Sequence, residues 1–170
     1  GCPFSCTFCV WGISALTKVR KFSMERVKSE LDYLAGRRTR SSVISLGDAN
    51  FGLLQRDVEI AQHIRDLYEN KKAFNRVQLY WAKISKPHMI DIGRILSKLT
   101  QTYIAFQSLD PEVLKNIKRK NIPTTDFIDF QKEVLEESDM RSTTELILSL
   151  PGETKETFLE TLVTIINSGI

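Results

Sequence analysis

The chain has 170 residues, 42% of them hydrophobic and 26% charged, which is the composition of one ordinary globular domain and not of a disordered segment. Its formal net charge of +3 is too small to indicate a polyanionic partner, so nucleic acid stays open only as a substrate. No apolar run is long enough for a membrane span, and no basic segment leads into an apolar one as in a secretory signal. We therefore expect a cytoplasmic protein without a membrane partner.

The first candidate site lies at the start of the chain, where Cys2, Cys6 and Cys9 fall within eight residues. Their spacing is too irregular for one face of a helix and suits a short loop that wraps three thiolates around one object. Three thiolates leave one iron of a four-iron cube without a protein ligand, and that iron is free to bind a substrate or cofactor. We therefore expect a 4Fe-4S cluster on these three residues.

Other uses of the thiols are less well supported. Structural zinc needs four ligands, and the two histidines, His63 and His88, lie far along the chain without ligand-like spacing. An odd number of cysteines does not favour a disulfide framework. A non-catalytic iron–sulfur or zinc module that binds a partner is the alternative to an enzyme.

After the cysteine loop, helical and strand patterns alternate to the end of the chain. Ser23 is the expected N-cap of the first helix, and Gly36 ends it. Strands are expected at 42–46, 76–81, 102–106 and 141–150. Helices are expected at 57–68, from Pro87 to 96, at 111–118, at 124–137 and at 154–167, the last with Phe158, Leu159, Leu162, Ile165 and Ile166 facing inward.

This alternation predicts parallel strands joined by helical crossovers. The expected fold class is α/β, a parallel-sheet partial (β/α) barrel of the TIM type, truncated at both ends, because a full barrel takes about 250 residues. We interpret residues 1–170 as one incomplete segment of a longer protein. Unpaired edge strands would favour self-association of such a fragment or a covering partner.

The cysteine loop resembles the signature of the radical S-adenosylmethionine (SAM) superfamily, in which an aromatic residue, here Phe8, precedes the third cysteine. Further matching stretches follow in order along nearly the whole chain: Leu46–Gly52, Gln107–Asp110 with Ile117–Arg119, and Glu145–Thr154. The likeness is strongest to members that often carry an upstream cobalamin-binding domain.

The resemblance implies a 4Fe-4S cluster that takes an electron from an external donor and cleaves SAM to a 5′-deoxyadenosyl radical. It implies one of three reactions on an unidentified substrate: cobalamin-assisted methyl transfer, ring contraction or another radical rearrangement, or methylthiolation. Cobalamin would be bound through a domain outside this chain.

The resemblance also implies roles for residues that follow the expected strands, where parallel α/β proteins bind ligands. The backbone around Gly47 and Asp48 would receive the methionine amine of SAM, and Gly47 has no Cβ to obstruct it. Arg119 would pair with the SAM carboxylate. Gln107, with Ser108 beside it, has the reach for a ribose or carboxylate, and Glu145 would contact ribose hydroxyls.

Simpler roles stay open for several of these residues. Arg119 belongs to a basic group that is typical of a solvated helix end, and Asp48 and Asn50 are common turn formers. Gly152 has either a turn role or a contact with adenine. The sequence departs from many related enzymes after the second expected strand, where Trp81-Ala82-Lys83 stands in place of an acidic residue.

Overall fold

The computed structural model describes residues 1–12, 17–37, 43–83, 86–135 and 142–169. Its elements follow one another as a short 3-10 helix and then alternating helices and strands. They are η1 (Val10–Gly12), α1 (Met24–Gly36), β1 (Val43–Ser45), α2 (Asp57–Lys71), β2 (Arg76–Gln78), α3 (Pro87–Leu96), β3 (Thr102–Tyr103), α4 (Pro111–Asn116), α5 (Thr124–Leu135), β4 (Ser142–Thr143) and α6 (Lys155–Asn167).

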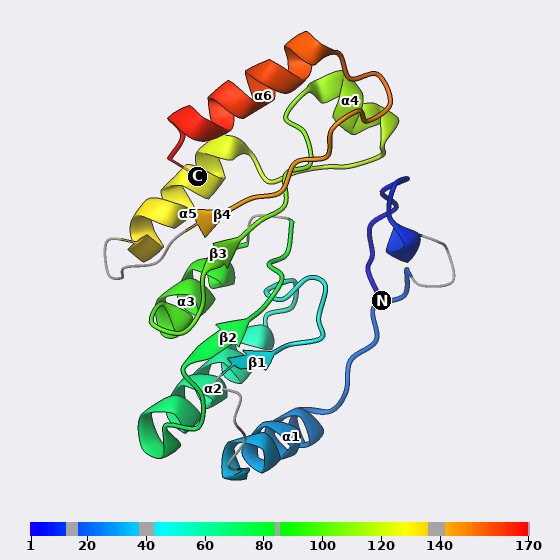
Figure 1. Ribbon diagram of the computed structural model, residues 1–170. Coiled ribbons are helices and arrows are strands. Elements are labelled where there is room, and N and C mark those ends of the chain that lie inside the picture. The colour runs from blue at the N-terminus through cyan, green and yellow to red at the C-terminus, as the bar shows by residue number, and fades with distance from the viewer. Residues whose placement is uncertain (13–16, 38–42, 84–85, 136–141, 170) are drawn as a thin grey trace.

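The strands pair in parallel, as the alternation predicts. β1 pairs with β2, with Ile44 opposite Val77, and β3 pairs with β4. Isolated parallel bridges continue both pairs beyond the strands, Phe51 with Trp81 and Gln107 with Leu146. The described strands thus form two two-stranded sheets, β1 with β2 and β3 with β4. Figure 1 shows the two sheets following one another from β1 to β4, so the fold is a partial α/β barrel of parallel strands.

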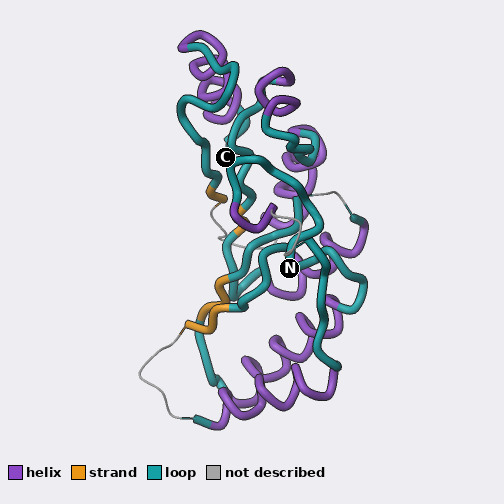
Figure 2. The backbone as a smooth tube through the Cα atoms, turned by 90° about the vertical axis from the view of Figure 1, so that its right-hand side faces the viewer, coloured by secondary structure: helices purple, strands orange, loops and turns teal. Residues whose placement is uncertain are grey.

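Helices cover one side of this strand row, and the N-terminal segment lies on the other side (Figure 1). α1 contacts α2, α2 contacts α3, and α3 contacts α5, which makes one outer layer. Side chains buried between this layer and the strands include Ile64, Ile92, Phe106 and Phe127. In Figure 2 the strands lie along one edge, and the helices of the lower half lie beside them.

Local sequence signals set the helix ends. The Ser23 side chain caps α1 by accepting a hydrogen bond from the Arg26 N–H, and Thr154 caps α6 in a capping box with Thr157. Proline begins α3 and α4, where its missing N–H costs nothing. Gly152 has φ of +88°, and an added Cβ would meet the Asn116 side chain, so a turn role is sufficient to explain this glycine.

Two expectations about individual residues are wrong. Leu159 and Ile166 were expected to face inward from α6, but they are 47% and 70% exposed. Thr161 and Ile165 are buried there instead, and the Thr161 hydroxyl accepts a hydrogen bond from the Leu109 N–H. The inward face of α6 therefore includes a polar residue that an apolar pattern does not select.

Within the described residues, no helix combines the length and the apolar character needed to cross a membrane.

Candidate functional site

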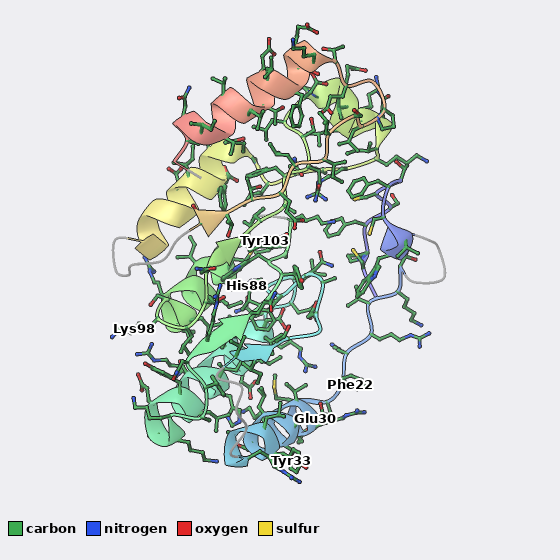
Figure 3. All side chains as sticks on the ribbon, in the orientation of Figure 1. Phe22, Glu30, Tyr33, His88, Lys98 and Tyr103 are labelled. Atoms are coloured by element: carbon green, nitrogen blue, oxygen red, sulfur yellow. The ribbon has the colours of Figure 1, made fainter. Side chains whose placement is uncertain are left out.

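The three cysteines lie on one loop that is tied to the rest of the fold. Cys2 and Cys6 are 5% and 3% exposed, and Cys9 is partly buried. The Cys9 N–H donates to the Cys6 carbonyl at 3.1 Å, and the Thr7 N–H donates to the carbonyl of Ile117, at the end of α4, at 3.0 Å. Figure 3 shows sulfur atoms gathered in this N-terminal segment, opposite the strands.

Hydrogen-bond donors and cations surround the thiols. The side-chain amide of Asn50 donates to Cys2 Sγ at 3.2 Å, and Lys83 Nζ lies 3.8 Å from Cys6 Sγ. Burial lowers the pKa of Arg119, while a hydrogen bond to Cys6 and the charges of all three cysteines act in the opposite direction. The Arg119 guanidinium is therefore close enough to the cysteine loop to favour the charged form of its thiols.

This donor set is suited to an anionic cluster. Thiolates bind iron in the deprotonated form, and amide and cationic donors stabilise their charge. Among the residues that the structure describes, no three His, Cys, Asp or Glu side chains could hold a single metal ion. The absence of a one-ion site does not bear on a four-iron cube, because each thiolate of such a cube binds a different iron.

A cavity of about 590 Å³ opens beside two of the cysteines. It reaches from the cysteine loop to the residues that follow β1 and β2 and to β3. Its lining includes Cys2, Cys9, Gly47, Asp48, Lys83 and Glu145, together with the aromatic residues Trp11, Tyr80, Trp81 and Tyr103. The structure therefore brings five of the ten predicted site residues to one cavity, namely Cys2, Cys9, Gly47, Asp48 and Glu145.

The loop after β1 presents backbone to this cavity. A Cβ built on Gly47 would have no heavy atom within 4 Å, so the space beside this lining residue is open. Asp48 Oδ1 accepts a hydrogen bond from the Asn50 N–H at 2.8 Å, which is the turn-forming role left open for it. This turn directs the Asn50 side chain to the cysteine loop, while Gly47 and Asp48 line the cavity.

Glu145 lines the cavity beside Tyr103. Burial raises the pKa of Tyr103 well above its usual range, and a hydrogen bond to Glu145 adds to the rise. The phenol therefore stays protonated and donates to the carboxylate. Tyr103 also packs edge-on against Tyr80, with ring centroids 5.6 Å apart, and Figure 3 shows Tyr103 on β3.

The other predicted residues lie outside the lining of this cavity. Gln107 is buried, has φ of 69° and pairs with Glu145 through its backbone N–H at 2.9 Å, while its Oε1 has no protein partner. Ser108 is fully buried and accepts a hydrogen bond from the Asp110 N–H. Phe8 is 38% exposed on the cysteine loop.

Arg119 is buried rather than solvated, at 6% exposed. Its guanidinium donates to the Ala105 carbonyl and, through Nε, to Asn121 Oδ1 at 2.6 Å. The role of a solvated helix end is therefore wrong for this residue. In this structure Arg119 is bonded to the backbone that follows β3 and lies within electrostatic reach of the cysteine loop.

Sequence reasoning gave no site role to Asn50, Lys83 or Tyr103. Asn50 was taken as a turn former, and Lys83 was noted only as a departure from related enzymes. Both side chains point to cysteines across long sequence separations, which a pattern along the chain does not reveal. Their position directly after strands β1 and β2 was the signal that could have found them.

Comparison with known proteins gives the family of this chain. A family profile described as the Radical SAM superfamily matches residues 1–165. The chain belongs to this superfamily.

The chain is 34% identical over 172 aligned residues to the cobalamin-dependent radical SAM methyltransferase TokK of Streptomyces tokunonensis. It is 33% identical over the same length to 2-(S-pantetheinyl)-carbapenam-3-carboxylate methyltransferase of Streptantibioticus cattleyicolor. Each alignment covers 99% of this chain and 25% of the relative, so the chain spans a quarter of their length.

Solved structures show the same fold. The radical SAM methyltransferase TsrM of Kitasatospora setae, bound to tryptophan and a SAM analogue, superposes with a TM-score of 0.78 at 17% identity, covering 99% of this chain and 32% of that one. Coproporphyrinogen III oxidase of Escherichia coli superposes with a TM-score of 0.63, covering 85% of this chain and 34% of that one. Membership in the superfamily implies a 4Fe-4S cluster and SAM as cofactors.

Proposed function

We propose that this chain is the SAM-cleaving core of a radical SAM methyltransferase that uses cobalamin. The cavity beside the cysteine loop carries the proposal, because it joins Cys2 and Cys9 to the backbone of Gly47 and the carboxylate of Glu145. When bound, a 4Fe-4S cluster supplies the electron that breaks the sulfonium C–S bond of SAM. Methyl transfer is favoured over rearrangement or methylthiolation because the two curated relatives are named as methyltransferases.

The residues of this chain have three tasks in that reaction. Cys2, Cys6 and Cys9 hold the cluster, Asn50 donates a hydrogen bond to Cys2 Sγ, and the positive charge of Arg119 favours the thiolate form of the cysteines. Gly47 leaves room for the methionine end of SAM, and Glu145 accepts hydrogen bonds from its ribose. The aromatic residues of the lining keep water from the reacting atoms.

The proposal includes cobalamin and a methyl acceptor only because the names of the relatives include them. The chain covers a quarter of each relative, so a cobalamin domain would lie in sequence outside it. The carbapenam named for one relative and the tryptophan bound in TsrM are ligands of those proteins. The family match gives no support to the non-catalytic alternative.

Detection of 5′-deoxyadenosine tests the proposal. The full-length protein would be reconstituted anaerobically with iron and sulfide and incubated with SAM and a low-potential reductant. We expect 5′-deoxyadenosine from the wild type and none from Cys6→Ala. A protein loaded with four irons that leaves SAM intact under these conditions would contradict the proposal.

A further inference from the structure

Lys83 is the one cationic side chain among the described residues that line the cavity beside the cysteine loop. Among the residues that line it, Lys83 is basic, Asp48 and Glu145 are acidic, and the others are uncharged or are the two cysteines. A ligand that carries a carboxylate would be repelled by the two acidic side chains and attracted to the Lys83 ammonium. Lys83 therefore marks the place in this cavity where an anionic group is accommodated.

The position of Lys83 also relates it to the cluster. Its Nζ lies 3.8 Å from Cys6 Sγ and 5.2 Å from the centre of the Phe4 ring. Among the described residues, no carboxylate lies within ion-pair distance of this ammonium. An ammonium has three donors, so a sulfur contact and a ring face leave donors for a ligand.

Arg119 is another cation near the cysteines, but it lies outside the lining of this cavity. Its side chain is 6% exposed, and its guanidinium donates to the Ala105 carbonyl and to Asn121 Oδ1. A ligand in the cavity therefore meets the Lys83 ammonium and not this guanidinium.

We infer that Lys83 is the residue that binds the carboxylate of the methionine part of SAM. This inference rests on the proposed function, because it takes SAM as the ligand of the cavity. Asp48 and Glu145, which share the cavity, then face the amine, sulfonium and ribose of the same molecule.

The test compares two ligands and four proteins by equilibrium binding to reconstituted protein of equal iron content. The ligands are SAM and decarboxylated SAM, which has the amine and sulfonium but no carboxylate. The proteins are the wild type, Lys83→Met, Lys83→Arg and, as a matched control, Lys86→Met, an exposed lysine three residues away.

We expect Lys83→Met to weaken SAM binding roughly tenfold and to leave binding of decarboxylated SAM unchanged, because only SAM offers the lysine a charged partner. Lys83→Arg should retain most of the affinity, and Lys86→Met should behave as the wild type. Equal affinity of the wild type and Lys83→Met for SAM, or an equal loss for both ligands, would overturn the inference. So would loss of iron from Lys83→Met, which would assign the lysine to the cluster. A wild type that binds no SAM would instead overturn the proposed function, and the inference with it.

Discussion

The side-chain amide of Asn50 donates a hydrogen bond of 3.2 Å to Sγ of Cys2, across 48 positions of sequence. Asn50 is 2% exposed, and its backbone is fixed independently by the Asp48 carboxylate and the Leu53 N–H. The amide is therefore held against the thiolate by the loop that also presents Gly47 to the cavity. Hydrogen bonds to cluster sulfurs are among the factors that set iron–sulfur reduction potentials.

We predict that Asn50→Leu lowers the reduction potential of the cluster. Leucine keeps the volume of the side chain and removes the donor, and the reduced cluster carries one more negative charge that the donor would stabilise. Potentiometric titration followed by EPR measures the shift. The exposed Asn75→Ala serves as control and should keep the wild-type potential. An unchanged potential in a fully loaded Asn50→Leu protein would show that this hydrogen bond does not tune the cluster.

Gly47→Ala should weaken SAM binding and leave the stability of the fold nearly unchanged. A Cβ at this position meets open space and its φ is not positive, so the free energy of unfolding should stay within about 1 kcal/mol of the wild type. The methyl group occupies space beside the methionine end of SAM, so SAM affinity should fall, and Gly47→Val should lower it further. Calorimetry measures the stability and the SAM affinity of each variant, with Gly36→Ala in α1 as control. Wild-type SAM affinity in Gly47→Val would remove this backbone from the ligand site.

Gly52→Ala should destabilise the fold, whereas Gly47→Ala should not. Its φ is +88°, and an added Cβ would lie 3.2 Å from Met89 Cγ, so the backbone of the loop is strained by any side chain. We expect a loss of about 1–3 kcal/mol in the free energy of unfolding, measured by denaturant titration beside Gly47→Ala. Equal stability of these two variants would show that the conformation at Gly52 is not required.

Glu145→Leu should weaken SAM binding by about 1–3 kcal/mol, the range for a hydrogen bond to a charged group. Glu145 is exposed, so we expect the lower part of that range. Tyr103→Phe keeps the ring against Tyr80 but removes the hydroxyl that bonds Glu145, and it should weaken binding by less. Calorimetry with reconstituted protein distinguishes the two. Unchanged affinity in Glu145→Leu would leave this carboxylate a structural role.

The helices could be predicted from sequence because their signals are local. Ser23, Pro87 and Thr154 begin helices α1, α3 and α6 where their cap and proline signals place them. The strands are shorter than the apolar runs suggested: the second was expected to reach Trp81, while β2 ends at Gln78. Regular strand pairing stops at Gln78 because the chain then enters the loops that form the site. Beyond this point, an isolated bridge between Phe51 and Trp81 continues the pairing of β1 with β2.

The candidate site was predictable only in part. The cysteines and Gly47 belong to short local motifs, so the sequence predicts them as site residues. The contacts of Asn50 with Cys2 and of Lys83 with Cys6 depend on how the loops after β1 and β2 approach the N-terminal segment. Arg119 was expected at a ligand or in solvent, and it instead donates to the carbonyl of Ala105, 14 positions earlier in the chain. Such long-range contacts have no signature along the chain.

The central claim is that Cys2, Cys6 and Cys9 hold a four-iron cluster with one iron open to SAM. EPR of the anaerobically reduced, reconstituted protein before and after addition of SAM tests it most directly. We predict the signal of a reduced 4Fe-4S cluster whose g values change when SAM is added, and a loss of that signal in Cys6→Ala. A signal from fully loaded wild-type protein that SAM leaves unchanged, or a Cys6→Ala protein with the wild-type spectrum, would contradict the claim.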